Sequence, residues 1–376
     1  MPMSLEGLKI LDLTRLFPGP YASLLLADLG ADVIKIERPG RGDYLRQVNR
    51  ASFCSINRNK KSIILNLKSV KGREIFHSLA KTADVVLEGN RPGVAARLGI
   101  DYDQVSVNNP GIIYCSISGY GQSGPYSTRA GYDINYMGVA GALTLKGRPH
   151  RPGILPIADL SSGMFAAVSI LAAIVSRQST GKGQYIDVSM TDGVLSWLSP
   201  FISDYQNGRA GEKDHGSAQY DIFQCSDGKY LSLGVLEDSF WKNLCKALGR
   251  SDMAEDLRYY NYIGRKLHTD NIYPVLEVAF KSKSRDEWLR ILNANDVPSG
   301  PVNSIASVQQ DPQVLHRKMI MDYPDFCSTG FPAWFSGSPV RMRLKAPEMG
   351  EHTEAVLRDL GYLSGEIEAL RRNSVI

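Results

Sequence analysis

The stretch LKILDLTRLFPGPYASLLLADLGADVIKIE, residues 8–37, decides the fold. It holds two short apolar runs, Leu8–Leu13 and Asp32–Glu37, which indicate buried strands. Between them, a Pro-Gly-Pro turn breaks the chain, and Tyr21–Leu29 indicates a helix that ends at Gly30. Two strands joined through a helix predict a βαβ unit and therefore a parallel sheet.

The same alternation continues along the chain. Further strands are predicted at Ser62–Leu67, Ala83–Glu88, Ile112–Ile117 and Gln184–Ser189, with helical segments between them. The pattern therefore predicts an α/β fold. The first strand–helix turn lacks the G-x-G-x-x-G fingerprint, which argues against a dinucleotide-binding role.

Composition excludes several classes of protein. The chain has 376 residues, enough for two or three domains, and its 43% hydrophobic and 22% charged content is typical of a soluble globular protein. The net charge is only +4 and no basic block occurs, so we expect no nucleic-acid partner. Five widely spaced cysteines without C-x-x-C argue against a disulfide framework and a metal site. The N-terminus lacks a signal-peptide pattern, so we expect a cytoplasmic protein with no membrane association.

The second informative stretch runs from Pro156 to Val175. It predicts a short strand at Ile154–Ala158, a lone carboxylate at Asp159, and an apolar helix that is buried on all sides and ends at Gly181. Asp159 has two interpretations, which the spacing alone does not separate. It caps the helix, or the helix N-terminus keeps it ionised as a nucleophile or base. In the second case the N–H groups of residues 161–163 are candidates to stabilise an oxyanion.

Polar side chains gather on the predicted loops after the strands. Each cation alone is typical of a solvated surface, but several at one edge of a sheet favour a ligand that carries phosphate. These cations are Arg38, Arg58, Lys60, Arg91 and Arg97. Asp133 is interpreted as a structural cap and Glu237 as a partner of a helix dipole.

The composition changes after residue 200. Asn207–Gly216 is polar and glycine-rich, which is typical of a linker. A hairpin is predicted at Tyr220–Gly234, and helices follow at Glu237–Leu248, Asn271–Phe280 and Ser284–Asn295. This part of the chain therefore predicts a second, α+β domain.

In combination, the motifs resemble those of the family III CoA-transferases, the group that includes formyl-CoA and carnitine CoA-transferases and α-methylacyl-CoA racemase. The likeness covers nearly the whole chain. It rests on Gly7–Thr14 with Pro18-Gly-Pro20, Leu29–Pro39, Asn57–Ser62, Arg91–Val94, Ser118–Gln122, Gly131-Tyr-Asp133, Asp159, Gly181–Gln184 and Gly300–Val302.

The resemblance implies a Rossmann-like large domain built from both chain ends and a smaller α+β domain, assembled into an interlocked homodimer. The implied boundaries are residues 1–200 for the first part of the large domain, 201–219 for a linker, 220–300 for the small domain and 301–376 for the return. The implied CoA contacts are Arg38, Asn57, Arg58, Lys60, Arg91, Arg97, Gly121 and Tyr132. The implied substrate pocket comprises Phe17, Tyr132, Asp133 and Glu237.

The resemblance also implies a reaction. Asp159 matches the family's nucleophile, which attacks an acyl-CoA thioester and passes CoA to a carboxylic acid through aspartyl anhydride and aspartyl-CoA intermediates. CoA is then a substrate, and no tightly bound cofactor is expected.

Two alternatives remain beside CoA transfer. Several segments look most like the racemase branch, but racemases pair the aspartate with a histidine where this chain has Tyr132. A tyrosine, with a pKa of about 10, is a poor base at neutral pH. This difference favours CoA transfer over racemisation. A catalytically silent subunit is the other alternative, and the retained Asp159 argues against it.

Overall fold

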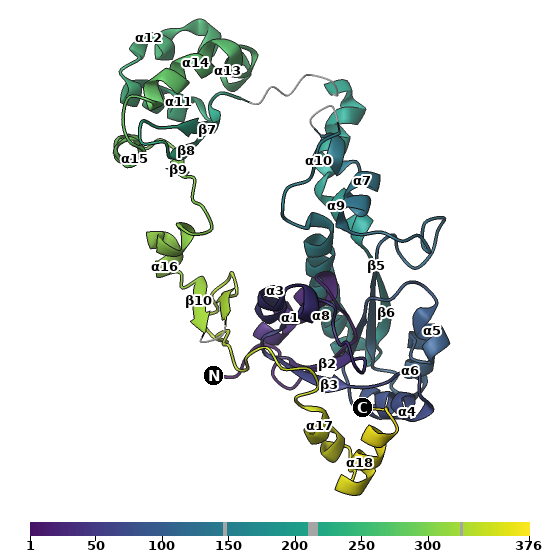
Figure 1. Ribbon diagram of the computed structural model, residues 1–376. Coiled ribbons are helices and arrows are strands. Elements are labelled where there is room, and N and C mark those ends of the chain that lie inside the picture. The colour runs from purple at the N-terminus through teal and green to yellow at the C-terminus, as the bar shows by residue number, and fades with distance from the viewer. Residues whose placement is uncertain (146–148, 210–216, 324–325) are drawn as a thin grey trace. The chain divides into compact units, whose positions relative to one another are not determined.

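The computed structural model describes residues 1–145, 149–209, 217–323 and 326–376 (Figure 1). The chain divides into two compact units. The first comprises Met1–Gly208 and Arg317–Ile376, and the second comprises Arg209–His316. The sequence placed a linker at residues 201–219, of which residues 210–216 lie outside the described part of the chain.

The first unit is built on a six-stranded sheet whose neighbouring strands are all parallel. Its strands are β1 (Lys9–Asp12), β2 (Asp32–Glu37), β3 (Lys60–Ile64), β4 (Val85–Glu88), β5 (Ile113–Ser118) and β6 (Gln184–Ser189). The spatial order is β3-β2-β1-β4-β5-β6, so the direction of winding reverses between β1 and β4. Doubly wound sheets bind ligands beyond the carboxyl ends of the strands at such a reversal.

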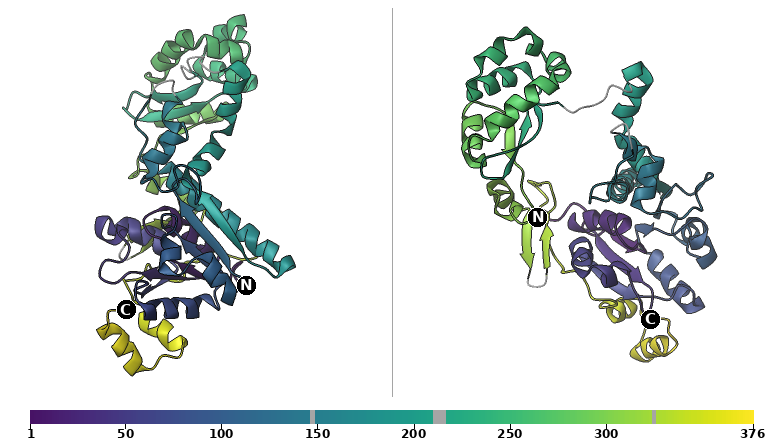
Figure 2. Two further views of the ribbon diagram at one scale, coloured as in Figure 1. Left: turned by 90° about the vertical axis from the view of Figure 1, so that its right-hand side faces the viewer. Right: turned by 45° about the horizontal axis from the view of Figure 1, so that its top comes forward.

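Alternate residues of each strand enter two different cores. Leu11, Ile34 and Val86 pack on one face of the sheet, and Ile10 and Val33 pack on the other. Figures 1 and 2 show helices on both faces. The first core is covered by α4 (Val70–Ala80), α6 (Tyr102–Asn108), α17 (Thr353–Asp359) and α18 (Ser364–Arg372), and the second by α1 (Pro18–Asp28) and α8 (Ile157–Thr180). The strands β1, β2, β4 and β5 are buried along nearly their whole length and read as largely apolar runs, which is why the sequence predicted them.

Helix α8 corrects two of the predictions. No strand precedes it, since Ile154 and Leu155 are exposed and the helix begins at Ile157. Its end is as predicted, because Gly181 adopts the left-handed conformation (φ 68°) that closes helices.

The helix is also not buried on all sides. Met164, Val168 and Val175 form an apolar stripe that is 45%, 60% and 65% exposed, while Ala166 and Ile170 lie in the core. Among the described residues, α8 alone is long and apolar enough to cross a membrane, a test that core helices of soluble proteins also pass. Its place against the sheet accounts for its length and its apolar character.

The remaining elements of the first unit lie around the sheet. They are α2 (Leu45–Val48), α3 (Arg50–Asn57), α5 (Val94–Leu98), α7 (Asp133–Val139), α9 (Met190–Trp197), α10 (Ser199–Asp204), β10 (Ile320–Tyr323) and β11 (Phe326–Thr329). Helices α1 and α7 both contact α8.

The second unit contains the predicted hairpin. Strands β7 (Tyr220–Gln224) and β8 (Tyr230–Gly234) pair antiparallel, and β9 (Ser299–Pro301) pairs with β8. The helices are α11 (Asp238–Leu248), α12 (Ser251–Glu255), α13 (Tyr262–Leu267), α14 (Thr269–Phe280), α15 (Arg285–Ala294) and α16 (Pro312–His316). Its own core includes Phe223, Trp241, Phe280 and Trp288, so the unit has a hydrophobic centre of its own.

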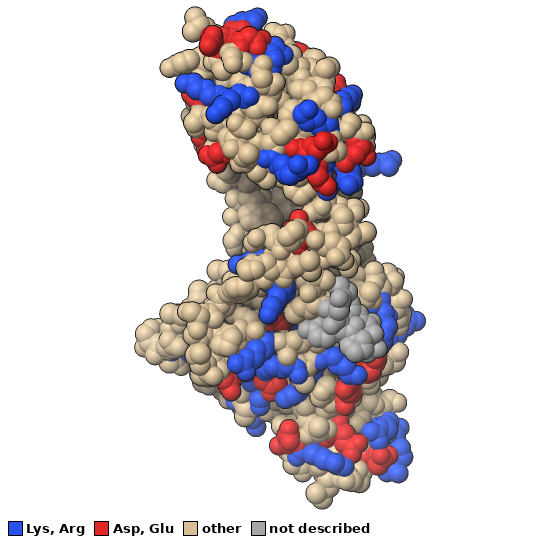
Figure 3. All heavy atoms as spheres, turned by 90° about the vertical axis from the view of Figure 1, so that its left-hand side faces the viewer, with Lys and Arg blue, Asp and Glu red and all other residues tan. Residues whose placement is uncertain are grey.

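Surface charges of both signs are mixed. On the face drawn in Figure 3, basic and acidic side chains are interspersed. Several form pairs along a helix, such as Lys281 with Glu277 and Arg358 with Glu354. Pairs of this kind, spaced four residues apart, support exposed helices by a few tenths of a kcal/mol, about 0.2–0.5 each.

Candidate active site

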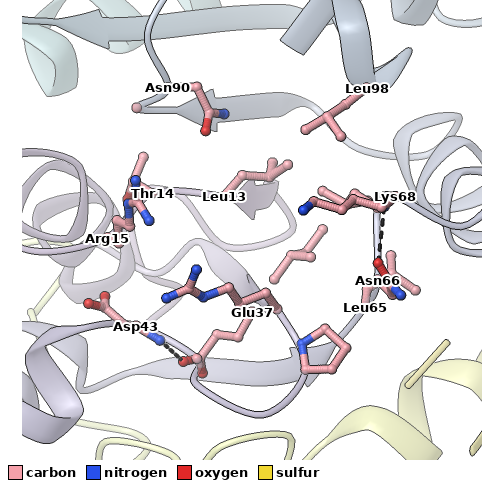
Figure 4. A pocket seen from close by; sticks show the side chains of 16 residues that line it. Leu13, Thr14, Arg15, Glu37, Asp43, Leu65, Asn66, Lys68, Asn90 and Leu98 are labelled. Carbon is pink, nitrogen blue, oxygen red and sulfur yellow. Dashed lines mark hydrogen bonds between the residues drawn. The ribbon is translucent and has the colours of Figure 1, made fainter. Parts of the chain in front are cut away.

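A cavity of about 420 Å³ lies where the sheet reverses its winding. Its lining comes from the segments that follow β1, β2, β3 and β4, and Figure 4 shows these side chains around one space. Arg15, Arg38 and Lys68 bring positive charge to it, while Glu37 and Asp43 are bonded within its wall. The sequence singled out Arg38 of this group. The cavity therefore has the place and the charge of a site for a ligand that carries phosphate.

Other lining residues were missed, although a signal for them existed. Thr14, Asn66 and Asn90 each lie within two residues of the end of a strand and line the cavity. Polar residues directly after parallel strands are the ones that reach such a crevice. The sequence analysis selected cationic residues as candidates for this edge of the sheet and did not select these neutral ones.

The turn before β3 has a different role from the one expected. Asn57, Arg58 and Lys60 are at most 3% exposed. Lys60 donates to the Asn57 side chain (2.8 Å) and to the carbonyl of Pro20 (2.9 Å), while Arg58 pairs with Asp28. Burial lowers the pKa of Lys60 to about 7. Because their polar groups are bonded inside the protein, these three side chains hold the fold and do not line the cavity.

The remaining predicted CoA contacts lie elsewhere in the first unit. Arg91 lines a second cavity, of about 470 Å³, together with Glu88. Arg97 is exposed on α5, and Gly121 has a positive φ (85°) in the loop after β5. Tyr132 is 73% exposed and directly precedes α7. The structure thus distributes these residues over several loops and places only Arg38 in the first cavity.

Asp159 lies in the first turn of α8 and does not cap it. The cap comes from Asp133, the first residue of α7, whose Oδ1 accepts the N–H groups of Ala158 (2.7 Å) and Asp159 (3.3 Å). Among the described residues, no hydrogen bond or ion pair engages the Asp159 carboxylate. The structure therefore separates the two interpretations, since one aspartate caps the helix and the other is left chemically available.

Burial governs the charge of Asp159. Burial first, and the neighbouring Asp133 carboxylate second, raise the pKa of Asp159 to about 7. Burial and the like charge of Asp133 therefore oppose the ionisation that the N-terminus of the helix favours. Near neutral pH the group is present in both forms, and carboxyls with such pKa values are typical of functional sites.

The residues behind Asp159 do not provide an oxyanion site. The hydroxyls of Ser161 and Ser162 donate to the carbonyls of Ala158 and Asp159 within α8. The helix already begins at Ile157, so the N–H groups of residues 161–163 are inside it. Gly163 instead serves packing, because a Cβ there would lie 2.7 Å from the carbonyl oxygen of Pro18.

The other candidates for the substrate pocket belong to different elements. Phe17 directly precedes α1, which contacts α8. Glu237 lies in the second unit, where it is exposed at the start of α11 and lines an open cavity with Asn261 and Tyr262. Asp133 and Asp159 belong to the first unit. Among the described residues, no three His, Cys, Asp or Glu side chains are grouped as a metal site.

Comparison with known proteins gives matches over nearly the whole chain. A model of CoA-transferase family III matches residues 5–353. Succinyl-CoA:glutarate CoA-transferase of Mus musculus is 36% identical, and the match covers 99% of this chain and 90% of that protein. Acetyl-CoA:oxalate CoA-transferase of Acetobacter aceti is 34% identical over 94% of this chain and 95% of that protein. Among solved structures, a CAIB/BAIF family protein from Brucella suis is 33% identical, with a TM-score of 0.86 over 96% of this chain and 100% of that chain.

Proposed function

Because this chain belongs to the family III CoA-transferases, we propose that it moves CoA from an acyl-CoA donor to a carboxylic acid, with Asp159 as the covalent nucleophile. One observation carries the assignment of the nucleophile. Asp159 is a half-buried carboxyl at the start of α8 that accepts no hydrogen bond from any described residue, while Asp133 caps the helix. An enzyme that forms a covalent intermediate needs such an available group.

The proposed reaction has four steps. The ionised Asp159 attacks the thioester carbonyl, so that an aspartyl anhydride forms and CoA thiolate leaves. The thiolate attacks the aspartyl carbonyl of the anhydride, which releases the donor acid and leaves an aspartyl-CoA thioester. The acceptor carboxylate then attacks the aspartyl carbonyl of this thioester, which forms a second anhydride, now between Asp159 and the acceptor, and releases the thiolate again. Attack of the thiolate on the acceptor's acyl carbonyl forms the new acyl-CoA and restores Asp159.

The first cavity is the proposed site of the nucleotide half of CoA. Arg15, Arg38 and Lys68 supply cations for its phosphates, and the cavity lies at the reversal of the sheet. Arg91, Arg97, Gly121 and Tyr132 stay in the proposal as contacts for the rest of the molecule. The turn containing Arg58 and Lys60 is not proposed as a CoA contact, because its side chains are buried and bonded within the protein.

We further propose short dicarboxylic acids and their CoA thioesters as substrates. The relatives support this class, because their names include succinate, glutarate and oxalate.

The sequence also favours CoA transfer over racemisation. It departs from the racemase pattern at Tyr132, which removes one of the two bases that α-proton exchange needs.

The homodimer is a proposal as well. The apolar stripe of Met164, Val168 and Val175 is exposed in the single chain, and an exposed apolar patch marks a surface that a partner covers. We assign this partner to a second copy of the chain, in the interlocked arrangement that the family likeness implies.

Trapping tests the proposed chemistry directly. The protein is incubated with succinyl-CoA, with and without hydroxylamine, and its intact mass is measured. We expect an adduct that maps to Asp159, is released or converted by hydroxylamine, and is absent from Asp159→Asn. Deuterium wash-in at the α-carbon of a 2-methylacyl-CoA without any adduct would instead show a racemase. A protein that binds CoA and does neither chemistry would be a silent subunit.

A further inference from the structure

The loop Leu13–Phe17 joins β1 to α1 and borders two parts of the proposed site. Leu13, Thr14 and Arg15 line the first cavity, as Figure 4 shows. Two residues beyond the far end of the loop, Gly19 lies in the first turn of α1, the helix that contacts α8. One short segment therefore separates the nucleotide cavity from the helix that carries Asp159.

A buried ion pair holds this loop. The Lys35 ammonium donates to the carbonyl of Thr14 (2.8 Å) and pairs with the Asp43 carboxylate (2.9 Å). The other oxygen of Asp43 accepts the N–H of Leu16 (3.1 Å). Both charged side chains are 0% exposed. The pair thus fixes the loop at two backbone positions and is shielded from water, where such bonds are strong.

The loop is held in a strained conformation. Leu16 has φ 64°, in the left-handed region, which costs a residue with a side chain roughly 1 kcal/mol or more. Its N–H bond to Asp43 helps to hold the chain in this conformation. Strain of this kind persists only where the surroundings over-determine the backbone.

The loop packs closely against α1, and α1 packs closely against α8. A Cβ at Gly19 would lie 2.2 Å from the Cβ of Thr14, so the loop and the first turn of α1 are in close contact. A Cβ at Gly163 would lie 2.7 Å from the carbonyl oxygen of Pro18, so α1 and α8 are also in close contact. Gly163 is four residues, about one turn, beyond Asp159 in α8. Close packing thus connects the loop, through α1, to the part of α8 one turn beyond Asp159.

We propose that Leu16 is a positioning residue: Lys35 and Asp43 hold the Leu13–Phe17 loop around it, so that one segment shapes the nucleotide cavity and aligns Asp159. This inference rests on the proposed CoA-transferase function. It predicts that freeing the loop weakens CoA binding and slows the chemical step together. A loop with a purely structural role would change the stability of the protein and leave the chemical step at its wild-type rate.

The test frees the loop without removing either charge. Leu16→Gly relieves the left-handed strain, so the fold is retained, while the loop gains freedom. Asp296→Gly is the matched control, because Asp296 also has a positive φ (53°) but lies in the second unit. The Kd of CoA is measured by calorimetry, and the rate constant of adduct formation is measured by quenched flow at saturating succinyl-CoA.

We expect Leu16→Gly to keep the wild-type Tm, to raise the Kd several-fold and to lower the rate constant roughly tenfold or more, as small misalignments at reacting groups do. Asp296→Gly should keep both values. Leu16→Asn should recover part of the rate, because asparagine tolerates the left-handed region and restricts the chain more than glycine.

Other outcomes overturn the inference. A Leu16→Gly protein with weaker CoA binding and a wild-type rate constant would show that the loop shapes the cavity but does not align Asp159. Equal losses in the Gly and Asn variants would assign the effect to the leucine side chain. A wild-type protein that binds CoA and forms no adduct at Asp159 would instead overturn the proposed function, and this inference with it.

Discussion

At the scale of single residues, two aspartates that lie far apart in the sequence have different roles at the start of α8. Asp133 satisfies the first N–H groups of the helix, which leaves the Asp159 side chain without a bond to any described residue. The same neighbour raises the pKa of Asp159, together with burial. The proposed nucleophile is therefore available, and with a pKa of about 7 it is only partly ionised at neutral pH.

This arrangement predicts a pH dependence. The carboxylate is the proposed nucleophile, so the rate of adduct formation should rise with pH through about 7 and level off above it. Asp133→Asn removes the like charge but keeps an oxygen that caps α8, so the midpoint should move to lower pH, by roughly 1 unit. The measurement is the rate of mass adduct formation from pH 5 to 9.

Asp192→Asn is the control for this profile, because Asp192 is an acid in the first turn of the neighbouring helix α9. Its profile should match that of the wild type. An unchanged midpoint in Asp133→Asn would mean that burial alone sets the pKa of Asp159.

A second prediction concerns stability. The pKa of Asp159 is about 7 in the folded protein and about 3.9 in an unfolded chain, so ionisation opposes folding. The penalty is absent below about pH 4, grows between pH 4 and 7 and stays constant above that. Asp159→Asn should therefore raise the free energy of unfolding by roughly 1–3 kcal/mol at pH 8 and abolish the adduct. Urea unfolding at pH 8 and pH 4 measures this difference, and an equal gain at both pH values would contradict it.

The sequence identified Asp159 but not its partner. Asp133 is 26 residues away along the chain, and it was interpreted as a cap without an indication of which helix it caps. Arg58 and Lys60 were expected to contact a ligand that carries phosphate, because they lie on a turn at the edge of the sheet. Their buried partners, Asp28 and Pro20, come from another element, and a local pattern contains no sign of such pairing.

At the scale of elements, the strands were predictable and the start of α8 was not. Parallel strands buried on both faces are continuous apolar runs, so their signal is local. Ile154 and Leu155 gave the same signal but are exposed, because the chain enters α8 at Ile157. The apolar face of α8 that points away from the sheet was likewise mistaken for a buried one. Composition reports that a surface is apolar but not what covers it.

The crossing of α1 and α8 gives a third prediction. Gly163→Ala places a Cβ against the backbone oxygen of Pro18, so the two helices must move apart. We expect a loss of about 1–3 kcal/mol in the free energy of unfolding and slower adduct formation. Gly138→Ala in α7 is the control, since its Cβ would meet its nearest neighbour at 3.7 Å. It should gain about 0.5–1 kcal/mol from helix propensity. Equal stability of the two variants, measured by urea unfolding, would contradict the tight crossing.

At the scale of the whole molecule, the order of the elements in the sequence predicted the α/β class. The family likeness added the expectation of a large domain built from both chain ends and a smaller α+β domain. The six-stranded order with a reversal between β1 and β4 depends on which strands pair, and pairing across the sheet has no local signature. The helices α17 and α18 illustrate this. They come from the end of the chain, yet Val356 and Leu370 pack in the same core as Leu11 of β1.

The stripe on α8 makes the final prediction, which tests the proposed homodimer. Met164, Val168 and Val175 share one face of the helix, and a charge placed among them is left buried if a second copy covers that face. Val168→Asp should therefore shift the protein from dimer to monomer in light scattering at micromolar concentration. Val107→Asp is the matched control, because Val107 is 76% exposed on α6 and outside the stripe, so it should leave the dimer intact. A Val168→Asp protein that remains a dimer would place the interface elsewhere, and a monomeric wild type would contradict the proposed dimer itself.

The interlocked arrangement of the dimer gives a separate expectation. Threaded chains cannot part while both are folded, so tagged and untagged wild-type dimers should exchange subunits only after unfolding.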